Sequence, residues 1–244
     1  MRALILAAGL GKRMRPLTNE MPKAMVLLKG KPLLEHVLQN CKKAGIEECV
    51  LVVGHLKEKI IEYFSKEFEG MKLQYVEQKE MNGTAKAIDL GKEFFGGKDE
   101  RFFGKTGEDF LVLSADVIVP EKYLQQLIAK KGFDAVMLAR EENHPEKYGV
   151  IEIDAKQNAV LGLEEKPEKP KSNLVNAGIY KFNKKIFSAI AKTGKNPLRG
   201  EFEITDSIKI LLKENAKVGF VLCKERIWDI GSLEELEKAN KIDS

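Results

Sequence analysis

The stretch RALILAAGLGKRMRPLT (2–18) decides the fold. Its first part, RALILAA (2–8), predicts a short buried strand, and a glycine-rich turn follows at once. Proteins of the α/β class place phosphate-binding turns at this point, where backbone N–H groups can approach phosphate oxygens closely. Cations gather in and just after the turn: Lys12, Arg13, Arg15 and Lys23. An ordinary surface loop with solvated charges is the alternative for this segment taken alone.

Two familiar phosphate-binding motifs do not fit the turn. A dinucleotide fingerprint that starts at Gly9 needs a third glycine where Met14 stands. A Walker A motif ending at Lys12 needs glycine where Leu6 stands. What remains is a glycine turn with several cations, and arginine can neutralise a phosphate with two parallel hydrogen bonds.

The first half of the chain alternates between strands and helices. Strands are expected at 48–54, 72–77 and 109–116, and helices at 33–44, at about 57–67 and after Gly83, with a glycine-broken loop at 96–107. The strands are apolar on both faces. This pattern predicts an α/β fold with a Rossmann-like, mostly parallel sheet and helices on both faces.

From about residue 133 the pattern changes to strands with few helices between them. Strands are expected at 134–140, 148–154, 159–164, 174–182 and 217–222, and helices at 184–192, at 204–214 and from an N-cap at Ser232. These strands predict an added mixed or antiparallel lobe. We therefore expect a single domain over 1–244, with one lobe at about 1–132, a second at about 133–227 and a C-terminal helix at about 232–242.

Composition excludes several classes of protein. The 41 basic and 37 acidic side chains give a net charge of +4 and are scattered along the 244 residues, so no nucleic-acid partner is expected. No apolar stretch is long enough to span a membrane. The three cysteines form no CxxC pair and the odd count fits a reducing compartment, which predicts a cytoplasmic protein. The three histidines are isolated and are not expected to bind metal.

The turn at 6–18, followed by Pro22-Lys23, resembles the signature of the sugar-1-phosphate nucleotidylyltransferases, which include glucose-1-phosphate thymidylyl- and uridylyltransferases. Further matching motifs follow in order: QKEMNGTA (78–85), SAD (114–116), YGVIE (148–152), EEKP (164–167), NAG (176–178), EITD (203–206) and WDIG (228–231). The ordered set outweighs the surface-loop alternative. It implies a nucleotide-diphospho-sugar transferase-like fold whose second lobe binds the sugar.

The resemblance implies a reaction in which a sugar 1-phosphate attacks the α-phosphorus of a nucleoside triphosphate and pyrophosphate leaves. It also implies a magnesium ion held by Asp116 and Asp229, each placed just after a strand. Either aspartate alone could instead cap a helix or a turn. No hexapeptide repeat follows WDIG, so neither an acetyltransferase activity nor trimerisation through a left-handed β-helix is expected.

The resemblance also assigns binding residues. The nucleotide-binding set is Ala8, Gly9, Gly11, Lys12, Arg13, Gln78, Gly83 and Thr84. Arg13 should hold the triphosphate and its pyrophosphate leaving group, Lys23 the phosphates that flank the reacting phosphorus, and Lys166 the sugar phosphate; these three are the expected catalytic residues. No general base is assigned, because the nucleophile is already ionised. Lys12 departs from the family, which usually has Ser or Thr there.

Substrate preferences follow from the same motifs. Gln78 and Gly83 have the spacing with which pyrimidine-using members read the base, which favours UTP or dTTP over GTP. Gly149, Glu165 and Asn176, with Lys166, match positions that contact the sugar phosphate and its hydroxyls. The sugar is expected to be glucose 1-phosphate or N-acetylglucosamine 1-phosphate. Alternatives are a mannose-1-phosphate guanylyltransferase, a CTP-using enzyme with another phosphate acceptor, and a non-catalytic relative; a homo-oligomer is possible. The EITD motif is interpreted mainly as structural.

Overall fold

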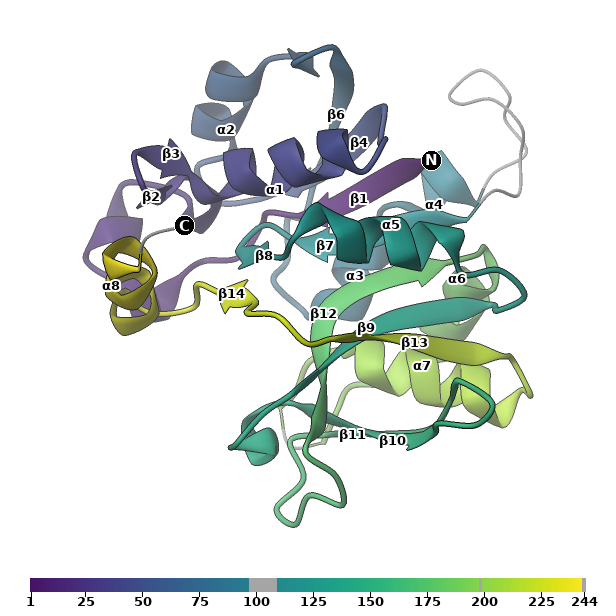
Figure 1. Ribbon diagram of the computed structural model, residues 1–244. Coiled ribbons are helices and arrows are strands. Elements are labelled where there is room, and N and C mark those ends of the chain that lie inside the picture. The colour runs from purple at the N-terminus through teal and green to yellow at the C-terminus, as the bar shows by residue number, and fades with distance from the viewer. Residues whose placement is uncertain (97–108, 198, 243–244) are drawn as a thin grey trace.

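The computed structural model describes residues 1–96, 109–197 and 199–242 (Figure 1). Nearly all of the loop expected at 96–107 lies outside them. One sheet of ten strands runs through the described chain, in the order β10-β11-β13-β9-β12-β7-β1-β4-β6-β5. The predicted fold class is confirmed.

The first half of the chain forms the parallel part of the sheet. Its strands are β1 (Arg2–Leu6), β4 (Glu48–Val53), β6 (Met71–Glu77) and β7 (Phe110–Ser114), and the short antiparallel β5 (Glu67–Phe68) closes this edge. Within β1, Leu4 pairs with Val50 on one side and Val112 on the other. Because parallel strands end at the same edge, the residues that follow β1 and β7 come together.

The second half extends the same sheet with mixed strands. They are β9 (Ala135–Glu141), β10 (Gly149–Asp154), β11 (Ala159–Glu165), β12 (Leu174–Phe182) and β13 (Val218–Cys223). β12 runs antiparallel to both β7 and β9, and its register shifts between Asn176 and Tyr180. β13 is parallel to β9, whereas β10 and β11 pair antiparallel.

Helices cover both faces of the sheet. On one face lie α1 (Leu33–Lys43), α2 (Lys57–Phe64) and α5 (Glu121–Ala129), and on the other α3 (Thr84–Asp89), α4 (Lys92–Phe95), α6 (Lys185–Ala191) and α7 (Ile204–Lys213). Neighbouring residues of β1 show the division, because Ile5 packs in the first core and Leu4 in the second. Figure 1 shows α1 and α5 side by side on the first face.

Two helix predictions need correction. The sequence analysis did not include α5, although its buried residues Tyr123, Leu124 and Leu127 lie at helical spacing. The helix predicted over 57–67 ends at Phe64, because Ser65 turns with a φ of 54° and Glu67–Phe68 forms β5 instead.

A third, smaller apolar cluster joins the glycine turn to the C-terminal helix α8 (Leu233–Lys241). Its buried members are Met14, Val26, Leu28, Leu33, Ile230, Leu236 and Ala239. In Figure 1 the yellow α8 lies against the purple segment that follows β1. The predicted N-cap is confirmed, since the Ser232 Oγ accepts a hydrogen bond from the Glu235 N–H at 3.3 Å.

Short elements complete the described chain. They are the strands β2 (Leu27–Leu28), β3 (Lys31–Pro32), β8 (Val117–Ile118) and β14 (Trp228–Asp229), and 3₁₀ turns at Lys12–Met14, Leu17–Asn19, Lys23–Met25 and Pro145–Lys147. None of the helices in residues 1–96, 109–197 and 199–242 has the length and apolar character to cross a bilayer.

Candidate active site

The turn after β1 is built around Gly11. Its φ of 61° lies in the left-handed region, and a Cβ added there would come within 2.7 Å of the Thr18 Cγ2 atom. The Thr18 hydroxyl donates a hydrogen bond to the Gly11 carbonyl at 2.8 Å and fixes the turn. Both the backbone conformation and the close packing therefore require glycine at this position.

A cleft of about 440 Å³ opens where β1, β6 and β7 end. Of the eight residues expected to bind nucleotide, the cleft is lined by Ala8, Gly9, Gly11, Lys12, Gln78, Gly83 and Thr84. Lys23 and Asp116 line it as well. Arg13 is not in the lining; its exposed side chain lies against Gly231 at the start of α8.

Asp116 and Asp229 come together although 112 residues separate them along the chain. β14 pairs with β8 so that Asp229 lies opposite Val117, and the Ile230 N–H donates to the Asp116 carbonyl at 2.9 Å. Burial, and next the negative charge of Asp116, raise the pKa of Asp229 to about 6. The β8–β14 pairing makes the two aspartates neighbours, and the charge of Asp116 contributes to this rise.

Each of these carboxylates has a cation beside it. The Lys23 ammonium forms an ion pair with Asp116. The Arg140 guanidinium lies 3.8 Å from the Asp229 Oδ2 atom, and it also contacts Glu142 at 2.9 Å and stacks on the Tyr148 ring at 5.0 Å. These cations offset the repulsion between the two carboxylates.

The two carboxylates fit a magnesium ion. Mg²⁺ is a hard cation that proteins commonly bind with one or two carboxylates, leaving the remaining positions to substrate phosphates and water. A divalent cation at this place would offset the repulsion between the two neighbouring carboxylates. Within the described ranges, no group of three or more His, Cys, Asp and Glu side chains forms a larger candidate site.

Three of the four expected sugar-binding residues, Gly149, Glu165 and Asn176, also lie together. A Cβ on Gly149 would lie 3.1 Å from the Glu165 Oε2 atom and 3.6 Å from the Asn176 Cβ atom. The Asn176 side chain donates to the Tyr180 hydroxyl at 2.5 Å and accepts from the Gly178 N–H at 3.0 Å. Lys166 follows directly after β11 with an exposed side chain and a φ of 46°.

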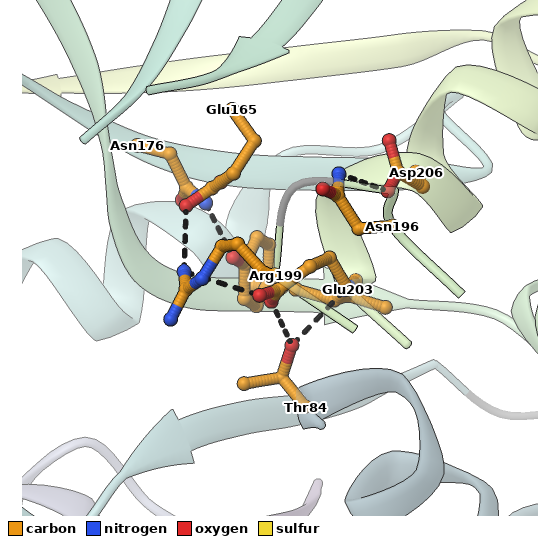
Figure 2. A network of polar contacts seen from close by, with 9 residues as sticks. Thr84, Glu165, Asn176, Asn196, Arg199, Glu203 and Asp206 are labelled. Carbon is orange, nitrogen blue, oxygen red and sulfur yellow. Dashed lines mark hydrogen bonds and ion pairs between the residues drawn. The ribbon is translucent and has the colours of Figure 1, made fainter. Parts of the chain in front are cut away.

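Figure 2 shows a polar network that links this group to the cleft. Arg199 bridges two carboxylates, that of Glu165 at 3.3 Å and that of Glu203 at 3.1 Å. The Thr84 hydroxyl donates to Glu203 at 3.3 Å and accepts from the Ile204 N–H at 3.0 Å. Burial raises the pKa of Glu203, while Arg199 opposes the rise. The loop that carries Gly83 and Thr84 is thus connected to the sugar side.

The sequence analysis missed three charged residues of this region. Arg199 stands four residues before Glu203 but outside any helix, so its spacing did not predict this ion pair. Arg140 is an arginine within the apolar strand β9, which is itself a signal for a buried ion pair. Glu201 lines the cleft near Gln78; no feature of its sequence position marked it out.

The protein-family model described as nucleotidyl transferase matches residues 2–244 of the chain. The chain belongs to this family. The resemblance to sugar-1-phosphate nucleotidylyltransferases is thereby confirmed.

Among curated relatives, the bifunctional protein GlmU of Methanocaldococcus jannaschii is 40% identical over 99% of the chain and 54% of its own length. The chain therefore spans about half the length of the first relatives it matches. The UTP–glucose-1-phosphate uridylyltransferase AglF of Haloferax volcanii is 32% identical, over 99% of the chain and 96% of AglF.

Solved structures agree with this family. A UDP-glucose pyrophosphorylase complexed with UDP-glucose superposes with a TM-score of 0.86 at 26% identity, covering 98% of this chain and 96% of that one. A putative glucose-1-phosphate thymidylyltransferase of Bacillus anthracis gives a TM-score of 0.83 at 26% identity, covering 100% and 97%.

Proposed function

We propose that this nucleotidyl transferase joins a nucleoside triphosphate to a sugar 1-phosphate. A phosphate oxygen of the sugar 1-phosphate attacks the α-phosphorus, the bond from that phosphorus to the bridging oxygen of the β-phosphate breaks, and pyrophosphate leaves with the bond electrons. The observation that supports this most is the convergence of three residues: Lys23 and Asp116 line the cleft together with the glycine turn, and β14 brings Asp229 next to Asp116.

Charge neutralisation is the main task of the site. Two unit charges 4 Å apart repel by roughly 4 kcal/mol at an effective dielectric constant of 20, and the nucleophile and the triphosphate are both polyanions. Lys12 and Lys23 line the cleft, and Arg13, the neighbour of Lys12, lies outside the lining, against Gly231. These residues bind and orient the phosphates, and the phosphate monoester needs no general base because it is ionised at neutral pH.

Asp116 and Asp229 would hold a magnesium ion in this reaction. Bound there, Mg²⁺ supplies positive charge to the phosphates and helps to orient them. Asp116 lines the cleft and Asp229 lies next to it across the β8–β14 pair, so both would supply oxygen ligands near the phosphates. Lys23, already paired with Asp116, is placed to contact the same phosphates.

A pyrimidine nucleotide, UTP or dTTP, suits the base end of the cleft. Gln78 and Gly83 line it together, and Gln78 is only 8% exposed. A glutamine amide and a backbone group can pair with the imide edge shared by uracil and thymine. The activity named for the AglF relative supports UTP.

For the sugar, the grouping of Gly149, Glu165 and Asn176 supports a hexose 1-phosphate of the glucose or N-acetylglucosamine type. We further propose that the enzyme acts in the cytoplasm.

The test is a grid of UTP, dTTP, GTP, CTP and ATP against glucose, N-acetylglucosamine and mannose 1-phosphates, scored by pyrophosphate release. We expect release only with a pyrimidine nucleotide, a sugar 1-phosphate and Mg²⁺ together. Asp116→Asn should abolish it, whereas Asp154→Asn, a matched change at the end of β10, should not. Faster turnover with GTP and mannose 1-phosphate would establish the guanylyltransferase alternative instead. Release without any sugar 1-phosphate would refute the proposal.

A further inference from the structure

Gly231 lies two residues after Asp229 and directly before the N-cap of α8. A Cβ added to it would come within 2.5 Å of the Arg13 Nη2 atom and 3.3 Å of the Arg13 Cζ atom. The guanidinium therefore fills the space that a side chain at this position would take. Gly231 does not have a positive φ, so its backbone conformation is open to other residues. The close approach of Arg13 is therefore the contact that a side chain at this position would disturb.

The backbone on which Arg13 rests is held from two sides. The Gly231 N–H donates to the Glu235 Oε2 atom at 2.7 Å and to the Asp229 carbonyl at 3.0 Å. The same Glu235 oxygen lies 3.2 Å from the point where the Cβ would stand. The guanidinium thus lies beside a carboxylate that caps the helix. Within the described chain, no carboxylate comes within 4 Å of Arg13, so a direct ion pair does not fix its position.

The third apolar cluster anchors both partners of this contact. Met14, the neighbour of Arg13, is fully buried there, and so is Ile230, the neighbour of Gly231. Leu236 of α8 completes the cluster. The cluster fixes the backbone of Arg13 and the backbone of Gly231. The open space beside Gly231, which has no side chain, therefore determines where the exposed Arg13 side chain can lie.

We propose that Gly231 is a positioning residue that seats the Arg13 guanidinium against the segment that carries the metal-binding Asp229. This inference rests on the proposed function, in which Arg13 binds the triphosphate and the pyrophosphate that leaves. The WDIG motif then serves two purposes, since Asp229 supplies a carboxylate and Gly231 supplies the seat from which Arg13 reaches the phosphates.

Stability measurements can distinguish a glycine that positions Arg13 from one that the fold itself needs. The atom that an alanine side chain would displace is the far end of a flexible side chain, which can move at little cost. Gly231→Ala should therefore leave the fold intact while it moves the guanidinium away from its seat. A purely structural glycine would instead show its effect in the melting temperature.

The experiment is a double-mutant cycle of Gly231→Ala and Arg13→Ala in the full chain. Calorimetry with Mg²⁺ measures the Kd for pyrophosphate and, separately, for UTP, and thermal unfolding gives Tm. Gly231→Ala should raise the Kd for pyrophosphate about 10-fold, which corresponds to about 1.4 kcal/mol, with Tm changed by about 1 °C or less. In the Arg13→Ala background it should change Kd by less than about 2-fold. The control is Gly194→Ala, whose Cβ meets nothing within 4 Å and whose φ is not positive.

Three results would overturn the inference: an equal loss of affinity in both backgrounds, an unchanged Kd in the single variant, or a Tm lowered by more than about 5 °C. Binding is measured without turnover, so the proposed function fails separately. If the protein is inactive with every substrate pair of the grid while the Arg13–Gly231 coupling is present, nucleotidyl transfer to sugar 1-phosphates is refuted. The positioning role of Gly231 for Arg13 is then still supported.

Discussion

Gly83→Ala is expected to destabilise the protein through a contact between two backbones. Gly83 has φ 117° and ψ 167°, a combination that is essentially confined to glycine. An alanine Cβ would lie 2.4 Å from the Phe202 carbonyl oxygen and 2.6 Å from its nitrogen. Neither atom belongs to a flexible side chain, so one of the two segments has to move.

The cost can be worked out from the hydrogen bonds on either side of this contact. The Phe202 N–H donates to the Asn82 carbonyl and the Ala85 N–H donates to the Phe202 carbonyl, both at 2.9 Å. Weakening both costs about 1–3 kcal/mol, and the backbone conformation adds about 1–3 kcal/mol. The smaller conformational freedom of alanine in the unfolded chain returns about 0.4–1 kcal/mol. The net loss in the free energy of unfolding is about 3 kcal/mol.

For a chain of this size a loss of about 3 kcal/mol lowers Tm by about 6–12 °C. Thermal unfolding followed by circular dichroism, with a urea titration for the free energy, measures it. The control is Gly9→Ala: Gly9 lines the same cleft, has no positive φ, and its Cβ would meet nothing within 4 Å. It should shift Tm by about 1 °C or less. If Gly83→Ala also unfolds within about 1 °C of the unaltered protein, the steric reasoning is wrong.

Three further outcomes are expected. Lys23→Met should lower kcat by about 10²–10³-fold, the scale of one transition-state charge contact, in steady-state pyrophosphate release; a near-normal rate would show that Lys23 is not needed. EDTA should stop turnover and excess Mg²⁺ should restore it, and activity that persists in the chelator would exclude the metal assignment. Lys181→Met should lower the free energy of unfolding in urea by about 1–3 kcal/mol, because Lys181 is 1% exposed, pairs with Asp109 at 3.2 Å and donates to the Lys130 carbonyl. The control is Lys184→Met, a change at an exposed neighbour, which should lower it by less than about 0.5 kcal/mol.

Periodicity and turn chemistry were enough to predict most of the fold. Buried strands such as β4 and β7 are continuous apolar runs, and a parallel arrangement follows from the helices between them. Placement of Asp116 at the carboxyl end of β7 followed directly. The end of α2 did not, because Ser65 adopts a left-handed conformation that its residue type rarely takes.

The convergence of the site could not be read from local pattern. Asp229 reaches Asp116 only because β14 pairs with β8, a contact between distant segments that no spacing encodes. The resemblance to a family supplied that expectation. The ion pairs of Arg140 and Arg199 were missed for the same reason, since a charged residue finds its partner through the tertiary fold.

Opposite charges already partner the residues proposed to bind substrate. Lys23 pairs with Asp116, Arg140 lies beside Asp229, and Arg199 holds Glu165. If the ion pair opens, either group left alone would be a partly buried, unpaired charge, which is costly. Lys23 can therefore leave Asp116 at low cost only if a phosphate binds the lysine and a divalent cation binds the carboxylate. In the proposed function, triphosphate and metal would therefore compensate each other at this pair. By reciprocity each should strengthen the binding of the other, so these ion pairs should favour the complete substrate over its parts.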